Sequence, residues 1–307
     1  MSTGADGDSV LATHELFKSY GSRPAVKNLE LRVHRGEIFG FLGPNGAGKT
    51  TTIRMALGLI RPSAGWVEVL GEDVARHGAR VLPRVGALIE APALYGYMSG
   101  RANLQAVAGV LGGISRQRLD EILELVDLAG RQRDRVKSYS LGMKQRLGVA
   151  MALLHDPELL VLDEPANGLD PAGIVEMRDL LRRLAGAGKT VFISSHVLGE
   201  VQQLCDRVAI LKAGELVRVA PVADLVGATG EFAARFDDPG PALALVRAQP
   251  WGAAARIEEG FLVTPSPTGR GRDLIHFLAA GGLWPDSVAP RQQGLEEIFL
   301  SLTGEVN

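Results

Sequence analysis

The sequence predicts an α/β protein built around a parallel sheet, followed by a smaller α+β part. Short apolar runs such as 38–42 and 159–162 have the continuous hydrophobic character of strands buried on both faces. Amphipathic helical patterns alternate with these runs. With 307 residues, 46% of them apolar, the chain is long enough for a large domain at 1–220 and a smaller one at 221–307.

The composition argues against a membrane-spanning, a secreted or a nucleic-acid-binding protein. The longest apolar runs, 106–114 and 147–154, are far shorter than the roughly 20 residues that span a bilayer. The first residues lack a basic region followed by an apolar stretch, so we expect a cytoplasmic protein. The single cysteine, Cys205, cannot form an internal disulfide, and we expect it to pack a helix. The net charge of −2 gives no electrostatic footprint for nucleic acid, so no nucleic-acid partner is expected.

Two strands are expected before the first strongly apolar run. Apolar residues alternate over 11–17 and 26–33, as in half-buried strands, with turn residues between them. Tyr20 lies at the end of the first strand. It is either a core residue or a ring on which a purine stacks.

A glycine-rich loop joins the strand at 38–42 to a helix at 51–57. The loop reads Gly43, Pro44, Asn45, Gly46, Ala47, Gly48, Lys49, Thr50, and Thr51 opens the helix. Its glycines let several backbone N–H groups point at one anion, and the helix adds its positive end. Lys49 supplies a cation for the outer phosphates, and Thr50 offers a hydroxyl to Mg²⁺. The sequence therefore predicts a nucleotide site.

The next stretch predicts strands at 66–70 and 86–89, so Glu90 lies at the carboxyl end of a strand. The segment 91–100 is irregular and rich in proline, glycine and aromatic residues. It is either a contact surface or an ordinary loop whose tyrosines cover the core.

A helical insert follows this segment and separates two sheet-forming halves. Its helices are expected at 103–112 and 116–128, where apolar residues recur every three or four positions. The basic run at 131–137 is expected to be a solvated connector. A further helix starts after Ser140, whose side chain suits an N-cap and, together with Gly142, a second phosphate contact.

Polar residues end two more predicted strands. The buried strand at 159–162 ends in Asp163 and Glu164, whose carboxylates need a partner such as Mg²⁺. The strand at 190–193 leads to His196. Because the carboxyl ends of parallel strands meet at one edge, we expect these side chains and Glu90 to converge there.

The small α+β part at 221–307 carries no constellation of chemical groups. Strands are expected at 208–211, 215–219, 232–236, 257 and 261–263, and helices at 172–184, 221–226, 241–248, 273–280 and 294–302.

Together, the loop at 43–50, the helix start at 139–144, the pair Asp163–Glu164, the turn at 168–170 and His196 resemble the ATPase subunit of an ABC transporter. The resemblance covers residues 11–219. It implies a P-loop NTPase fold of the ABC type, with a RecA-like core, an antiparallel β subdomain and an α-helical subdomain. Within the family, the small carboxyl-terminal domain resembles that of bacterial export ATPases for bacitracin, lantibiotics and other drugs.

The resemblance implies ATP hydrolysis coupled to transport, with ATP and Mg²⁺ as cofactors, and roles for individual residues. Tyr20 is similar to the aromatic that stacks on adenine, and Lys49 to the lysine that contacts the β- and γ-phosphates. Thr50 and Asp163 are similar to the residues that hold Mg²⁺. Glu164 matches the general base and His196 the histidine beside the γ-phosphate.

The resemblance also implies partners. Ser140 and Gly142 match the signature that touches ATP bound to another subunit, and Asp170 the turn that couples two sites. We therefore expect an ATP-dependent head-to-tail homodimer and a separate membrane permease, which would hold the protein at the inner face of the membrane. The segment 91–100 would be the docking surface.

Two positions depart from the common pattern of the family. Leu141 replaces the first glycine after the signature serine, so its side chain must turn away from the nucleotide. Glu90 replaces a glutamine that senses Mg²⁺ and the membrane partner, and we expect it among the metal and nucleotide ligands. A soluble family member that acts on ribosomes or DNA is the alternative, although such relatives carry two cassettes or a coiled-coil insert.

Overall fold

The computed structural model describes residues 8–226, 228–292 and 294–303. They form two compact units, of which the first runs to Val222 and the second contains Ala223–Ser301. None of the helices in these ranges has both the length and the hydrophobicity of a membrane-spanning segment.

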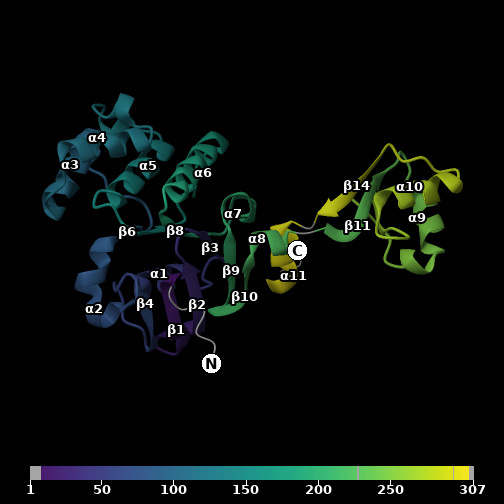
Figure 1. Ribbon diagram of the computed structural model, residues 1–307, viewed down its shortest axis with the longest axis horizontal. Coiled ribbons are helices and arrows are strands. Elements are labelled where there is room, and N and C mark those ends of the chain that lie inside the picture. The colour runs from purple at the N-terminus through teal and green to yellow at the C-terminus, as the bar shows by residue number, and fades with distance from the viewer. Residues whose placement is uncertain (1–7, 227, 293, 304–307) are drawn as a thin grey trace. The chain divides into compact units, whose positions relative to one another are not determined.

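A six-stranded sheet organises the first unit (Figure 1). Its strands, in the order β10-β9-β3-β8-β7-β6, are β3 (Ile38–Leu42), β6 (Val85–Leu88), β7 (Leu159–Asp163), β8 (Thr190–Ser195), β9 (Arg207–Lys212) and β10 (Glu215–Pro221). All neighbours pair in parallel except β10, which runs antiparallel to β9 at one edge. The carboxyl ends of β3, β6, β7 and β8 therefore share one edge of the sheet.

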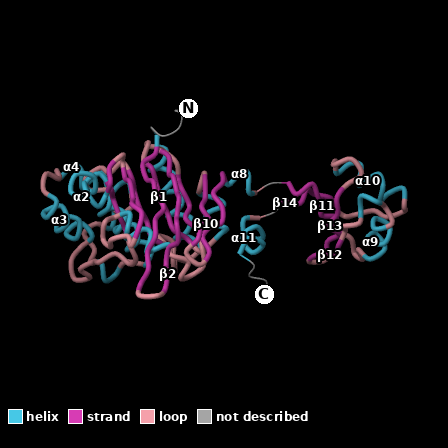
Figure 2. Tube along the Cα trace, turned by 90° about the horizontal axis from the view of Figure 1, so that it is seen from below, coloured by secondary structure: helices cyan, strands magenta, loops and turns pink. Residues whose placement is uncertain are grey.

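A second, antiparallel sheet has the order β2-β1-β4-β5. Figure 2 shows its two longest strands, β1 and β2, side by side. Its strands are β1 (Ser9–Tyr20), β2 (Arg23–His34), β4 (Ala64–Val69) and β5 (Glu72–Asp73). The first two strands are longer than their alternating apolar pattern, because pairing continues to Tyr20 and Arg23 on either side of the turn. Gly21 at this turn has φ +61°, which glycine adopts without steric cost.

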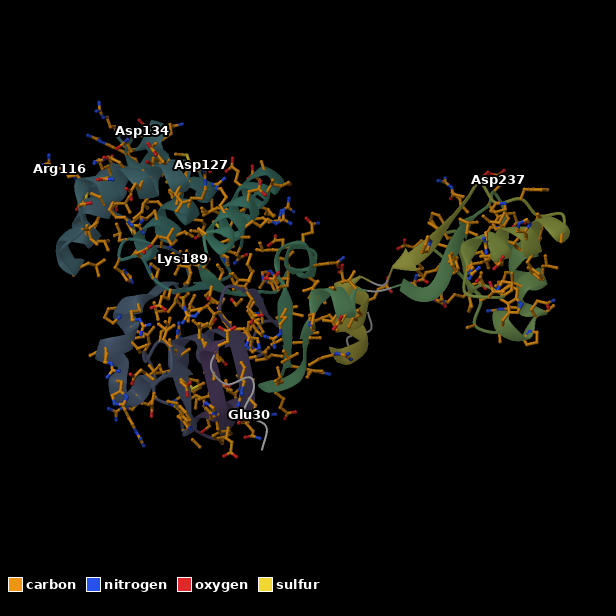
Figure 3. The ribbon with its side chains drawn as sticks, viewed as in Figure 1. Glu30, Arg116, Asp127, Asp134, Lys189 and Asp237 are labelled. Carbon is orange, nitrogen blue, oxygen red and sulfur yellow. The ribbon has the colours of Figure 1, made fainter. Side chains whose placement is uncertain are left out.

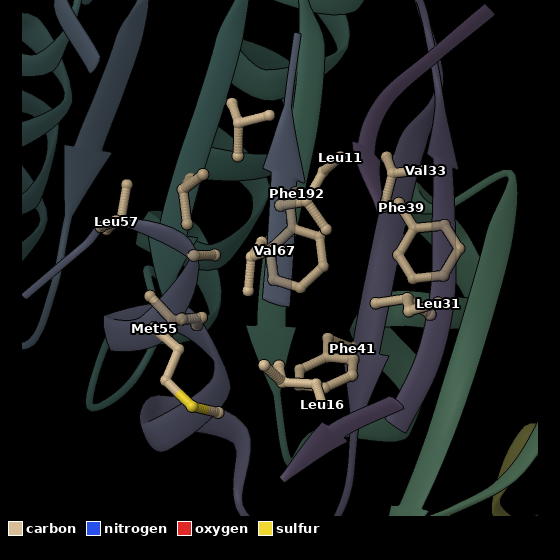
Figure 4. Close-up of a cluster of buried hydrophobic side chains, with 14 of the residues drawn as sticks. Leu11, Leu16, Leu31, Val33, Phe39, Phe41, Met55, Leu57, Val67 and Phe192 are labelled. Atoms are coloured by element: carbon tan, nitrogen blue, oxygen red, sulfur yellow. The ribbon is translucent and has the colours of Figure 1, made fainter. Parts of the chain in front are cut away.

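The main core lies where the antiparallel sheet and α1 (Lys49–Ala56) meet the parallel sheet (Figure 4). Phe41 of β3 and Phe192 of β8 pack with ring centroids 5.3 Å apart. Leu16, Leu31 and Met55, all at most 2% exposed, surround them from the other elements. This packing fixes the strand β3, which leads into the glycine-rich loop at 43–50.

Further helices of the first unit are α2 (Val74–Val81), α3 (Gly100–Leu111), α4 (Arg116–Leu125), α5 (Leu141–Ala152), α6 (Pro171–Gly186) and α7 (Leu198–Leu204). The short helix α8 (Val222–Leu225) begins at the last residue of this unit. Short 3₁₀ turns occur at Leu82–Arg84, Ala129–Arg131, Val136–Ser138 and, in the second unit, Pro250–Gly252. The helices α3, α4 and α5 form a group between β6 and β7 in the chain (Figure 1), and α3 and α4 correspond to the two helices of the predicted insert. Charged side chains such as Arg116 and Asp134 lie on the outer side of this group (Figure 3).

The second unit combines a four-stranded antiparallel sheet with the helices α9 and α10. It consists of β11 (Ala228–Arg235), α9 (Gly240–Arg247), β12 (Arg256–Glu258), β13 (Phe261–Pro265), α10 (Gly271–Ala280) and β14 (Ser287–Gln292), and the described chain ends in α11 (Leu295–Thr303). The strand order β12-β13-β11-β14 makes this β-α-β-β-α-β unit a split βαβ, or ferredoxin-like, arrangement. Its core contains Phe232, Leu262, Leu274 and Leu278.

Candidate active site

The phosphate loop, residues 43–50, is held in a shape that requires glycine at two positions. Gly48 has φ +103°, and a Cβ there would lie 2.5 Å from the Ala25 carbonyl oxygen. A Cβ on Gly43 would lie 2.8 Å from the Leu211 carbonyl oxygen. The Gly214 N–H also donates to the Ala47 carbonyl oxygen at 3.1 Å. The loop is therefore supported by β2 on one side and by the turn between β9 and β10 on the other.

Lys49, the first residue of α1, holds its ammonium group against the loop. Its side chain is only 6% exposed, and Nζ donates to the Gly43 carbonyl oxygen at 2.6 Å. The same Nζ lies 3.2 Å from Oε1 of Glu164. A nearly buried cation is expensive unless it is paired, and Glu164 provides that pairing from the end of β7.

Thr50 and Asp163 place two oxygen ligands side by side at the mouth of the loop. The Thr50 hydroxyl donates to Oδ2 of Asp163 at 2.8 Å, and Asp163 is 4% exposed. Hydroxyl and carboxylate oxygens are the ligands that Mg²⁺ takes from proteins, usually with substrate phosphates and water completing its shell. The donor set therefore fits Mg²⁺ bound with a nucleotide. Among the described residues, no group of three or more His, Cys, Asp or Glu could hold a metal by itself.

Glu164 joins the ends of three strands. It has φ +52°, in the left-handed region, and its N–H donates to the Ser194 hydroxyl at 3.0 Å. Its Oε2 contacts Nδ1 of His196, while Oε1 faces Lys49. The carboxylate thus lies between a lysine that follows β3 and a histidine that follows β8.

A cleft of about 1240 Å³ connects these groups with the antiparallel sheet. The loop residues Pro44 to Thr51, Asp163, Glu164 and His196 line it, together with Tyr20. Tyr20 is 52% exposed, and the ammonium of Lys18 lies 5.3 Å from the centroid of its ring. Of the two interpretations of Tyr20, the structure places it in the cleft and outside the core.

The start of α5 carries the predicted signature residues. The Ser140 hydroxyl accepts a hydrogen bond from the Met143 N–H at 3.2 Å, so Ser140 is an exposed N-cap. A Cβ added to Gly142 would have its nearest neighbouring atom 3.8 Å away, which leaves room beside this backbone. From the same helix, Leu141 and Gln145 border the cleft. The Leu141 side chain lies against Gly168, which has φ +75°.

Glu90 follows β6 at the same edge and also lines the cleft. It has φ +61°, and its carboxylate pairs with the guanidinium of Arg54 on α1. Its side chain is 65% exposed. The Glu90 carboxylate thus pairs with Arg54, whereas the Asp163 carboxylate bonds Thr50. Asp170, also a predicted site residue, caps α6 by accepting from the Gly173 N–H at 3.0 Å.

Sequence reasoning missed two residues at this edge. Ser194 is fully buried and contacts both Asp163 and Glu164, although the sequence indicates only a strand end there. Arg54 pairs with Glu90, and it lies four residues after Thr50 on the same helix. A polar side chain at the end of a strand with a buried pattern is the signal that could have found Ser194.

A second cavity, of about 370 Å³, lies behind Glu164 and His196, between α6 and α7. Glu200 of α7 borders it. Burial raises the pKa of the Glu200 carboxyl, and the charge of Glu164 raises it further, while His196 opposes the shift. The Glu200 carboxyl therefore keeps its proton to a higher pH than an ordinary glutamate does.

Comparison with known proteins finds that the chain is similar to ATP-binding proteins of transporters. A family model described as ABC transporter matches residues 26–167. The bacitracin transport ATP-binding protein BcrA of Bacillus licheniformis is 49% identical over 214 residues, or 69% of this chain and 70% of that protein. The daunorubicin resistance ATP-binding protein DrrA3 of Streptomyces coeruleorubidus is 38% identical over 308 residues, or 97% of each chain. A solved structure of cbiO1 from Clostridium perfringens, part of the ABC transporter complex cbiONQ, matches with a TM-score of 0.65 and 27% identity over 71% of this chain and 90% of that one.

Proposed function

The chain belongs to the ABC transporter ATP-binding family, and from this premise we propose that it hydrolyses ATP to drive export through a separate membrane permease. The fold class and the family predicted from the sequence are confirmed. The roles of individual residues, the dimer and the transported substrate belong to the proposal.

One observation carries the chemistry: the Glu164 carboxylate lies between Lys49 and His196, beside the Thr50–Asp163 pair. In this arrangement, Lys49 and the loop N–H groups bind the β- and γ-phosphates of ATP. Glu164 accepts a proton from the water whose oxygen attacks the γ-phosphorus, and ADP leaves with the bridging oxygen. His196 orients the Glu164 carboxylate through Nδ1 and faces the γ-phosphate. Bound Mg²⁺, held by Thr50 and Asp163, would supply charge stabilisation to the phosphates.

The proposed dimer places two copies head to tail. Ser140 is exposed at the amino end of α5, where a helix favours an anion, and Gly142 leaves its backbone open to close approach. Each copy would present this helix end to the γ-phosphate of ATP bound to the loop of the other. Two such symmetric contacts close on themselves, so the pair forms a dimer without further growth.

The permease would dock on residues 91–100. Tyr95 and Tyr97 are 55% and 72% exposed, and their ring centroids lie 5.9 Å apart. The backbone beneath them is held in place, because the side chain of Asn103, which is 1% exposed, bonds both the N–H and the carbonyl oxygen of Tyr95. Exposed tyrosines on a fixed backbone are typical of contact surfaces. This contact would hold the protein at the inner face of the membrane.

The named relatives indicate the class of cargo. BcrA is a bacitracin transport protein, and DrrA3 is a daunorubicin resistance protein. We therefore assign this chain to export of an antibiotic or drug. The DrrA3 match spans 97% of this chain, so it includes the second unit as well.

Two measurements test the function. The purified chain should release phosphate from ATP in a Mg²⁺-dependent manner, and Lys49→Ala should abolish this release. The tagged chain should also co-purify from detergent-solubilised membranes with a multi-span membrane protein identified by mass spectrometry. Recovery with ribosomes or DNA instead would contradict the export function and favour a soluble family member.

A further inference from the structure

Asp163 and Glu164 are adjacent in sequence but need different surroundings. Asp163 ends β7 and faces Thr50, whereas Glu164 turns toward Lys49 and His196. The left-handed backbone of Glu164, at φ +52°, separates the two carboxylates. Such a conformation is unfavourable for a residue with a side chain, so contacts around it must hold it.

Ser194 makes these contacts from the neighbouring strand. It is the residue of β8 paired with Asp163 in the sheet register, and it is fully buried. Its hydroxyl donates to Oδ1 of Asp163 and accepts the N–H of Glu164 at 3.0 Å. The same N–H lies 3.2 Å from the Ser194 carbonyl oxygen.

The direction of these bonds follows from the chemistry of the groups. A hydroxyl has one proton and two lone pairs, and a carboxylate can only accept. Ser194 must therefore give its proton to Asp163 and receive the amide proton of Glu164. Oδ1 of Asp163 is then engaged by Ser194, while Oδ2 faces Thr50.

Resting on the proposed function, we propose that Ser194 is a positioning residue that aims both carboxylates. Its hydroxyl holds Asp163 so that Oδ2 faces Thr50, the other proposed Mg²⁺ ligand. It also fixes the left-handed backbone that points the Glu164 carboxylate at His196. Hydrogen bonds to the residues that ligate a metal orient those residues, and the loss of such a bond typically lowers metal affinity or activity about 10- to 100-fold.

The test compares Ser194→Ala with Ser194→Thr, which keeps the hydroxyl. The matched control is Thr190→Val, because Thr190 is also fully buried on β8 and its hydroxyl accepts the Gly36 N–H at the opposite end of the strand. For each protein, three quantities are measured: kcat and KM for ATP, and the Mg²⁺ affinity of the ADP-saturated protein by calorimetry.

Ser194→Ala should lower both kcat and the Mg²⁺ affinity by about tenfold or more, with KM for ATP within about twofold. Ser194→Thr should restore most of the Mg²⁺ affinity, and Thr190→Val should leave it unchanged. If Ser194→Ala binds Mg²⁺ like the wild type, or if Thr190→Val weakens it equally, the positioning role is wrong. Absence of hydrolysis in the wild-type protein would instead contradict the proposed function, whatever the variants do.

Discussion

Nδ1 of His196 contacts Oε2 of Glu164. The two residues follow the neighbouring parallel strands β8 and β7. The other oxygen, Oε1, lies 3.2 Å from Nζ of Lys49. Lys49 and His196 are far apart in the chain, and one carboxylate links them because β3, β8 and β7 are neighbours in the sheet. Removing the charge of that carboxylate should therefore affect catalysis, while Lys49 keeps its hydrogen bond to the Gly43 carbonyl oxygen of the loop.

Replacing Glu164 by glutamine should separate ATP binding from hydrolysis. Glutamine keeps the size of the side chain but cannot accept the proton of the attacking water, so turnover should fall about 10²- to 10⁴-fold. ATP binding should persist, because Lys49 and the loop are intact, and ATP should drive dimer formation. Phosphate release and size-exclusion chromatography with ATP provide the two readouts.

Glu158→Gln is the matched control for this prediction. Glu158 immediately precedes the amino end of β7, whereas Glu164 follows its carboxyl end. It pairs with Arg35 and Arg84, so the same change of charge occurs far from the loop. Its turnover should stay within about twofold of the wild type. Near-normal hydrolysis by Glu164→Gln would rule out Glu164 as the base.

The head-to-tail arrangement predicts complementation between two inactive variants. Lys49→Ala removes the cation of the loop, and Ser140→Arg blocks the signature helix. In a mixed dimer, one site combines both defects and the other has neither, so random mixing should recover up to about a quarter of the wild-type sites. Phosphate release is measured for each variant alone and for the mixture. No recovery on mixing, with mixed dimers demonstrated by two different tags, would contradict the shared site.

The sequence predicted the parts of the candidate site whose residues lie close together in the chain. The loop at 43–50 and the acidic pair at 163–164 are each carried by a strand and its following residues, so spacing along the chain was sufficient. The pairing of Glu90 with Arg54 depends on how α1 lies beside the end of β6, and no local pattern encodes that distance. Ser194 was missed for the same reason, because its role comes from its register with Asp163.

The missed elements of the fold have similar physical causes. β14 contains Pro290 and Arg291 and lacks a strand-like apolar pattern, but its backbone pairs with β11 in the sheet. α2 contains Gly78 and a non-helical His77, which weaken its helical signal. α7 is only seven residues long and is stabilised by packing of Val201, which is fully buried.

Cys205 should report unfolding of the first unit. It follows α7, is 7% exposed, and lies so close to Gly40 that a Cβ there would be 3.0 Å from its Sγ. Burial raises the pKa of the Cys205 thiol, and the nearby charges of Asp206 and Glu37 raise it further, so the reactive thiolate is scarce. A disulfide reagent should therefore modify the native protein at least about a thousandfold more slowly than the urea-unfolded protein. Equal rates in both states would contradict the buried position, and Cys205→Ser gives the background signal.

The stability of the second unit should depend on the ionisation of Glu231. Hydrogen bonds from the guanidinium of Arg256, at 2.7 and 3.0 Å, lower the pKa of the Glu231 carboxyl below its ordinary value of 4.5, and Arg291 at 3.3 Å contributes in the same direction. Because the folded-state pKa is depressed, the stabilisation is fully present above the unfolded pKa near 4.5 and is lost as the pH falls through the lower folded value.

Glu231→Gln should therefore destabilise the second unit at pH 7, and its difference from the wild type should shrink as the pH falls below about 4.5. Hydrogen exchange of the β11 and β13 amides in the full chain, compared between the two proteins at each pH, measures this difference locally. Glu259→Gln, at an exposed position in the turn between β12 and β13, is the control and should match the wild type at every pH. A difference between Glu231→Gln and wild type that stays constant down to the most acidic pH measured would show that packing, rather than the charge on Glu231, accounts for the loss.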